Sequence, residues 1–394
     1  RIESEILIEG QPPEYGQDGK IEWLKDFFTE GFEVDPATGA LDYRRPKSHR
    51  AVEAGQALAR YTPPIPSRPG KDVFGKVIEV LKPADPGIRA GQNVEYRTEE
   101  ATYYSTATGR VAFVDEVLSV DPVFHIEGNV GLETGNIDHP GPVAVEGDVE
   151  AGAEIIAKGD VEIHGILETA RVVTQGSLLV HGGIAGSSDV VIEVDGEVHA
   201  KFILDATIRA KGAIVVEKEI RHSSVYTRGD IVMPKGDLIG GDTKALGTIT
   251  VNDLGSDALT PTEVWVGEDY WLPGELARYE EEVSELQAKL EKIEVGLEPL
   301  KKPGLHLAPE KEAAVAKLEE GAAQMRTSID ELHQAGEQIK QDSRDRRKTT
   351  MLINAMVFPE SVIHIRKDVL RVRDPLKGPA EARLEKGRVI LLPK

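Results

Sequence analysis

A six-residue period of aliphatic side chains in the middle of this 394-residue chain restricts its fold more than any other feature. Seven consecutive positions of the period are aliphatic, and a small residue lies four positions after all but one of them. The aliphatic series is Val143, Val149, Ile155, Val161, Leu167, Val173 and Leu179. Such a period is typical of a coil whose short strands each direct a side chain inward.

A coarser repeat in the same segment sets the length of one coil. A Gly-Asp step precedes a valine at Gly147-Asp148-Val149 and again at Gly159-Asp160-Val161. A unit of about 18 residues with three apolar sub-units predicts a three-sided parallel β-helix. The Gly-Asp steps are predicted to form its corners, because corners need bent or positive-φ backbone. This period permits either handedness.

Proline and aromatic residues are scarce in the same segment. None of the 23 prolines lies between Pro142 and Pro234, and only Phe202 and Tyr226 are aromatic between Val143 and Asn252. Proline would remove a donor from a strand ladder, and large rings would not fit a narrow interior. The composition therefore favours the same fold.

The spacing of apolar residues changes after Trp271. Two series follow with the alternating steps of three and four that are typical of a heptad seam. The first is Leu276, Tyr279, Val283, Leu286, Leu290, Ile293, Leu297 and Leu300, and the second is Val315, Leu318, Ala322, Met325, Ile329, Leu332 and Ile339. Two prolines and a glycine in KKPGLHLAP, residues 301–309, predict a turn between them. We therefore expect an antiparallel coiled-coil hairpin.

The N-terminal part consists of short apolar segments separated by glycine-containing turns, which predicts a β-rich barrel or sandwich. PPEYGQDGKIEWL begins with turn residues and continues as a strand, with a short helix over residues 21–28 as the alternative. VEAGQ at 52–56 and IRAGQ at 88–92 repeat each other, which favours paired β-hammerheads as in biotinyl-lipoyl-like folds.

These patterns divide the chain into four parts. The fold class is mainly β with an inserted α-helical hairpin. We expect an N-terminal β-rich domain at 1–125, the β-helix at 126–271, the hairpin at 272–355, and strands that complete or cap the β-helix at 356–394.

Composition excludes several kinds of chemistry. The chain has no cysteine, so disulfides, thiolate metal sites and cysteine nucleophiles are excluded. A net charge of −21 opposes binding to nucleic-acid phosphates. No apolar run approaches the roughly 18 residues of a transmembrane helix, and no signal peptide is visible, although the start at Arg1 leaves room for a longer native N-terminus. GGIAGSSD and LIGGDTKALG lack the GK[ST] ending of a phosphate loop and are interpreted as tight corners.

Three histidines are the strongest candidates for a metal ligand or a general base. His164, His181 and His199 are 17 and 18 residues apart, which predicts one face in successive coils. Stacked strands lie about 4.8 Å apart, so a metal could bind only where the rings converge. We interpret the three as outward surface residues, and we predict no catalytic, cofactor-binding or metal-binding residue.

Seven motifs occur in an order that covers almost the whole chain. They are DGKIEW, PGKDVFGKVI, TGRVAFVDEVLSVDPVFHIEGNV, GDVEIHG, GGIAG, GDLIGGDTKALGTITVNDLGS and VLRVRDPLKGPAEARLEKG. This order resembles the flagellar assembly protein A (FapA) family, a bacterial family of largely unknown function. The resemblance implies a right-handed β-helix with an inserted coiled coil, and a cytosolic, non-catalytic role in flagellar assembly or placement. It assigns no site residue.

We expect a non-enzymatic scaffold or adaptor for flagellar assembly and motility, in the cytoplasm or peripheral to the inner membrane or cell pole. Protein partners would bind the hairpin and the N-terminal domain, and a homo-oligomer is compatible with the sequence. One alternative is a hexapeptide-type acyl- or nucleotidyltransferase that uses His164, His181 or His199 as its base. Another is a bactofilin-like polymer, which the predicted domains at both ends of the β-helix oppose.

Overall fold

The computed structural model describes residues 9–29, 32–34, 36, 41–46, 50–301 and 309–393. It divides into two compact units, Arg1–Ala200 and Lys201–Lys394, each of which is considered by itself. Most of the predicted turn at 301–309 lies outside the described residues.

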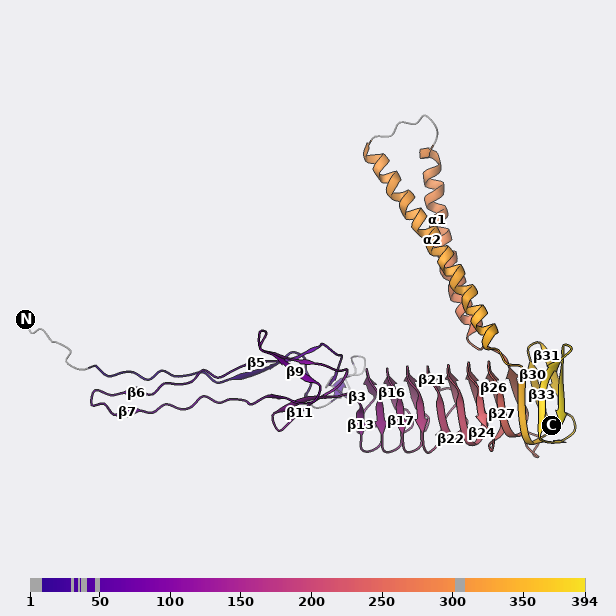
Figure 1. Ribbon diagram of the computed structural model, residues 1–394, viewed down its shortest axis with the longest axis horizontal. Helices are drawn as coiled ribbons and strands as arrows, with labels where there is room; N and C mark the ends of the chain where they lie inside the picture. The colour runs from indigo at the N-terminus through magenta and orange to yellow at the C-terminus, as the bar shows by residue number, and fades with distance from the viewer. Residues whose placement is uncertain are drawn as a thin grey trace, which may run out of the picture. The chain divides into compact units, whose positions relative to one another are not determined.

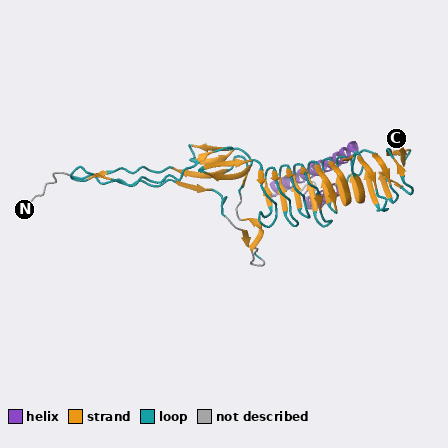
Figure 2. Ribbon diagram, turned by 90° about the horizontal axis from the view of Figure 1, so that it is seen from below, coloured by secondary structure: helices purple, strands orange, loops and turns teal. Residues whose placement is uncertain are grey.

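Two four-stranded sheets form the N-terminal part of the first unit (Figure 2). One has the order β1 (Lys20–Trp23), β5 (Ala57–Thr62), β10 (Thr102–Ser105), β9 (Val94–Arg97), and the other has the order β4 (Ala51–Val52), β11 (Gly109–Val114), β12 (Val117–Asp121), β8 (Arg89–Ala90). Their shared core contains Phe27, Leu58, Val111 and Leu118. The segment KIEW is a strand, so the helical alternative is wrong over these residues.

The repeated VEAGQ and IRAGQ motifs occupy equivalent places in these sheets. Each motif contributes an edge strand, β4 or β8, to the two ends of one sheet. The strand after each motif, β5 or β9, then flanks β10 in the other sheet. The sequence repeat is therefore a repeat of structure.

An extended ribbon also belongs to the N-terminal part (Figure 1). Strands β6 (Gly70–Lys71) and β7 (Val77–Ile78) form a hairpin, and residues 11–17 pair with residues 65–71 through isolated bridges. A further hairpin consists of β2 (Phe32–Val34) and β3 (Leu41–Pro46).

The rest of the first unit is a β-solenoid, as the six-residue period predicts. One stack of parallel strands is β13 (Phe124–Ile126), β15 (Val143–Val145), β17 (Val161–Ile163), β19 (Leu178–Val180) and β22 (Val198–Leu204). A second is β14 (Ile137–His139), β16 (Glu154–Ala157), β18 (Arg171–Thr174) and β21 (Val191–Val194). Bridges between residues 130, 149, 167 and 184 form the third face, where β20 (Ile184–Ala185) lies.

Most of the predicted inward positions are correct. The first five residues of the aliphatic series are at most 1% exposed, and the series is Val143, Val149, Ile155, Val161 and Leu167. The prediction is wrong for Val173 and Leu179, which are half-buried, while their neighbours Val172 and Leu178 are 0% exposed. The coil from residue 161 to residue 178 has 17 residues, one fewer than the coil from 143 to 161. A fixed six-residue step therefore loses register.

In the second unit the parallel stacking continues through eight strands. They are β23 (Thr207–Ala210), β24 (Ile214–Thr227), β25 (Ile231–Met233), β26 (Asp237–Ala245), β27 (Ile249–Leu254), β28 (Thr262–Val266), β29 (Thr350–Val357) and β30 (Ser361–Ile365). The pairing then becomes antiparallel in β31 (Asp368–Arg371), β32 (Leu376–Lys377), β33 (Ala380–Glu385) and β34 (Arg388–Pro393).

Two long helices are inserted between β28 and β29 (Figure 1). They are α1 (Leu272–Leu297), which continues into a short 3-10 turn at Glu298–Lys301, and α2 (Pro309–Arg346). Leu276 lies beside Gly336, and Glu294 pairs with Arg326, so the helices run in opposite directions. The first predicted seam is buried or half-buried from residue 276 to residue 297, whereas Leu318 of the second seam is 45% exposed.

Candidate interaction site: the base of the helical hairpin

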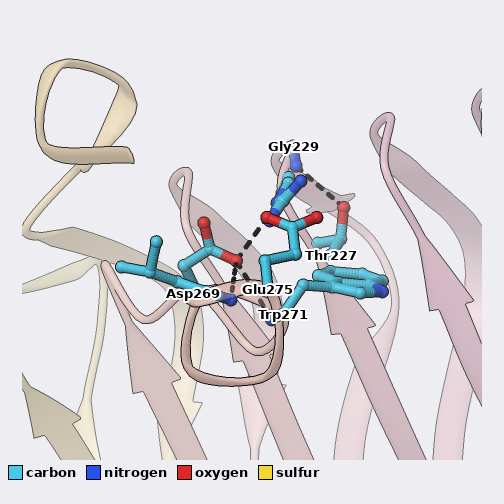
Figure 3. Close-up of polar contacts among 7 residues, drawn as sticks. Thr227, Gly229, Asp269, Trp271 and Glu275 are labelled. Atoms are coloured by element: carbon cyan, nitrogen blue, oxygen red, sulfur yellow. Dashed lines mark hydrogen bonds and ion pairs between the residues drawn. The ribbon is translucent and has the colours of Figure 1, made fainter. Parts of the chain in front are cut away.

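An arginine clamp holds the first turn of α1 against the second unit (Figure 3). Arg228 follows β24, and its guanidinium Nε lies 3.1 Å from Asp269 Oδ1 while Nη2 lies 2.6 Å from Glu275 Oε2. The side chains of Arg228 and Asp269 are only 16% and 2% exposed. Charge-assisted hydrogen bonds of this kind are roughly twice as strong as neutral ones. The clamp therefore fixes where the hairpin begins.

The Asp269 carboxylate also caps the helix. Its Oδ1 accepts hydrogen bonds from the backbone N–H groups of Trp271 (3.1 Å) and Leu272 (3.2 Å). These donors have no intrahelical partner, because they belong to the first turn. Pro273 needs no such partner, and Glu275 places negative charge near the positive end of the helix dipole. One buried carboxylate thus joins the arginine to the helix backbone.

Charge pairing keeps the arginine ionised despite its burial. Burial alone would lower the pKa of Arg228, but the hydrogen bond from Glu275 and the charge of Asp269 outweigh it and raise the pKa. The guanidinium also lies 5.4 Å from the ring centroid of Trp271. A buried pair of this kind specifies a geometry more than it adds stability.

A column of stacked side chains lies beside the clamp. Tyr226, Lys244, Trp265 and His364 are register partners on four successive parallel strands. The Trp265 and His364 rings stack with centroids 4.5 Å apart, and the Lys244 ammonium lies 4.6 Å from the Trp265 centroid. Tyr270, just before α1, stacks on Tyr226 at 4.1 Å with the planes 7° apart. The hairpin base therefore rests on an aromatic and cationic column.

A hydrogen bond fixes the tyrosine of this column. The Tyr226 hydroxyl donates to Asp242 Oδ2 at 2.7 Å, and the Ser224 hydroxyl donates to Asp242 Oδ1 at 2.7 Å. Burial and the hydrogen bond to Asp242 raise the pKa of Tyr226 to about 12. The tyrosine therefore remains a neutral donor at physiological pH.

The distal part of the hairpin exposes apolar side chains. Val295 is 63% exposed, Leu318 is 45% exposed and Leu300 is 36% exposed. Apolar side chains away from the packed seam are available to another protein. The site thus combines a fixed base with an apolar distal surface.

The candidate histidines lie on the first unit, and only two of them share a column. His164 and His181 directly follow the paired strands β17 and β19, and their ring centroids are 4.8 Å apart. The prediction is wrong for His199, which is the register partner of Leu179 rather than of His181. The coil from residue 178 to residue 198 has 20 residues, so the 18-residue spacing falls two positions short. His199 instead pairs with Glu197 at 3.1 Å.

Strand stacks and hairpin together define a β-solenoid protein with an inserted pair of helices. The family model described as the Flagellar Assembly Protein A beta solenoid domain matches residues 122–389, and the model of the Flagellar Assembly Protein A N-terminal region matches residues 2–116. The chain belongs to the Flagellar Assembly Protein A family.

No curated protein and no solved structure matches the chain. Within the described part of the chain, neither helix combines the length and the apolar character needed to span a bilayer.

Proposed function

We propose that this protein is a non-enzymatic scaffold in flagellar assembly, and that the helical hairpin is its docking arm. The observation that carries the proposal is the buried clamp of Arg228 on Asp269 and Glu275, because it gives a long surface element a fixed attachment. A docking arm gains from such preorganisation, since less conformational freedom is lost on binding. The name of the family supplies the flagellar context.

The N-terminal ribbon is the second surface of the proposed scaffold. Phe74 is 92% exposed and Val73 is 48% exposed at the turn between β6 and β7, and Leu81 is 91% exposed nearby in the sequence. A pocket in the ribbon is lined by Pro64, Pro66, Val77 and Val80 among others. Rigid, exposed apolar side chains of this kind suit recognition of a protein partner. We place this role in the cytoplasm, at the inner membrane or the cell pole.

Photo-crosslinking in a flagellated host tests the docking arm. A photoreactive amino acid at Val295 or Leu318 should give a discrete crosslinked protein, and mass spectrometry should identify a flagellar component. The same probe at Glu385, on strand β33 outside the hairpin, is the control. Crosslinks of equal yield and identity from all three positions would contradict the assignment.

A truncation tests whether the arm is needed. Residues 281–332 are replaced by a short Gly-Ser linker, which retains Asp269 and Glu275 and the facing part of α2. We expect a folded chain that fails to restore swimming to a strain that lacks the gene. Full restoration of swimming by the truncated chain would remove the hairpin from the proposed function.

The non-enzymatic part of the proposal is tested separately. A thermal-shift screen with acyl-coenzyme A compounds and nucleotide sugars should leave the unfolding temperature unchanged. A saturable shift that disappears in His164→Ala or His181→Ala would favour the transferase instead.

A further inference from the structure

Two carboxylates and two imidazoles gather on the outer face of the first unit. Glu146, His164 and His181 each follow a strand of one stack, so they form a column across three successive coils. Glu162 lies two residues before His164 and extends outward from β17. The side chains of His164, His181 and Glu162 are 46%, 49% and 44% exposed, so solvent ions reach them.

The nitrogen and oxygen atoms of this cluster converge. His181 Nε2 lies 2.8 Å from Glu162 Oε1, and His164 Nε2 lies 3.3 Å from the same oxygen. One ligand atom from each of these three residues falls within 4.8 Å of the others. Ligands of a tetrahedral metal with bonds of about 2.0–2.1 Å are separated by roughly 3.3 Å. Small side-chain movements therefore suffice to place one ion among the three atoms.

Glu146 determines which nitrogen of His164 is free. Its Oε2 lies 3.1 Å from His164 Nδ1, on the side of the ring away from Glu162. A carboxylate that accepts the Nδ1–H of a histidine fixes the ring and leaves Nε2 as the ligand, which is the usual arrangement around protein-bound zinc. An accidental surface pair of histidines does not require this second carboxylate.

The backbone holds the two histidines in a fixed relation. The N–H of His164 donates to the carbonyl of Val145 at 2.9 Å, and the N–H of His181 donates to the carbonyl of Ile163 at 2.9 Å. Both residues thus belong to the hydrogen-bonded coil rather than to a free loop. Fixed ligand positions reduce the entropy cost of binding.

We propose that Glu162, His164 and His181 form a surface site for a divalent transition metal ion, with Glu146 orienting His164. Two imidazoles and one carboxylate suit zinc and its neighbours, whereas magnesium and calcium prefer oxygen ligands. Three protein ligands leave one position of a tetrahedral ion open to water or to a group from a partner. The site joins β17 to β19, so a bound ion would crosslink neighbouring coils.

Metal binding to the full chain without a histidine tag tests the site. Cobalt(II) chloride should give the visible absorption of a tetrahedral complex and saturate at one ion per chain, and zinc(II) chloride should displace it. His164→Ala and His181→Ala should each weaken binding by at least tenfold. Circular dichroism should show unchanged secondary structure in both variants, because both side chains are half exposed.

His199→Ala is the matched control. His199 also pairs with a glutamate on the same stack of strands, but its ring is not in the column of His164 and His181. This variant should bind cobalt as the parent chain does. Equal affinity in all three alanine variants, or binding that does not saturate at one ion, would overturn the site. Glu162→Gln should weaken binding further than Glu146→Gln, because only Glu162 is a direct ligand.

Discussion

The Gly-Asp steps show how single residues allow the coils to stack. Gly147 and Gly165 do not have positive φ, contrary to one reason given for glycine at these corners. A Cβ on Gly165 would lie 2.6 Å from the carbonyl oxygen of Gly147 in the preceding coil, so glycine is required by close approach. Asp148 Oδ1 accepts the N–H of Ile166 at 2.7 Å, which satisfies the corner of the next coil.

A different corner does need the left-handed conformation. In the second unit Asp205, His222 and Gly240 have φ values of 50°, 48° and 68°. Only glycine adopts this conformation without steric cost, and aspartate tolerates it better than most residues. The interpretation of LIGGDTKALG as a tight corner is therefore supported at Gly240.

Replacing Gly147 with alanine should destabilise the protein. The new Cβ would lie 2.8 Å from the backbone of Gly128, which cannot move without disturbing the adjacent strands. Overpacking of this kind costs about 1–3 kcal/mol. Gly128→Ala is the matched control, since its Cβ would meet no atom within 4 Å. Chemical denaturation should separate the two variants, and equal midpoints would contradict the close-approach argument.

Stability should depend on His139 below neutral pH. This side chain on β14 is 2% exposed, and burial lowers its pKa, with Arg110 lowering it further against Pro122, Asp121 and Asp138. The unfolded chain therefore takes up a proton at a higher pH than the folded chain does. The free energy of unfolding should fall as pH drops below about 6.5.

His139→Leu should reduce this pH dependence. His125→Leu removes an exposed histidine near the same coil and should retain it. Denaturation midpoints measured from about pH 7.5 down to the lowered pKa of His139 provide the comparison. Parallel curves for the parent chain and His139→Leu would count against a neutral, buried His139.

At the scale of elements, the sequence predicts which segments pair more reliably than it predicts register. Heptad spacing located the packed face of α1 from Leu276 to Leu297 because that seam is local in sequence. Coil length varies from 17 to 20 residues, since corners differ in length, and this variation displaced Leu179 and His199 from their expected places. Convergence of His164 with His181 depended on a coil whose length matched their spacing.

The clamp at the hairpin base was not predicted. Arg228 and Asp269 are 41 residues apart, and no periodic pattern connects them. A usable signal is local to α1, where an aspartate precedes a proline-containing helix start in EDYWLPGEL. The arginine partner is determined only by the stacking of the coils.

Arg228→Met should loosen the base of the hairpin. It leaves the Asp269 carboxylate buried without its cation, and removing one partner of a buried pair costs about 3–5 kcal/mol. Hydrogen exchange should show faster exchange in residues 269–276 than in the parent chain. Arg221→Met is the control, because it breaks a more exposed pair with Glu219 that is worth at most about 1 kcal/mol. Unchanged protection in Arg228→Met would show that the clamp does not hold the helix.

At the scale of the whole molecule, repetition made the solenoid predictable and its closing strands less so. Each coil contacts mainly its neighbours, so a period in the sequence directly specifies the stack. The final strands β31–β34 reverse direction and pair antiparallel with β29, with β30 and with one another. Strand segments such as SVIHIRKDVLRVRD were visible in the sequence, but strand direction depends on the turns between them, which carry no periodic signal.

Those antiparallel strands should prevent self-association through the end of the stack. Unpaired N–H and C=O groups on a strand edge are a template for pairing with another chain. Deleting residues 366–394 removes the partners of β29 and β30, so sedimentation velocity should show species that grow with protein concentration. Replacing residues 281–332 with a short linker removes a larger segment but leaves the edges paired, and it should not cause growth. Equal growth in the full chain would instead support a bactofilin-like polymer.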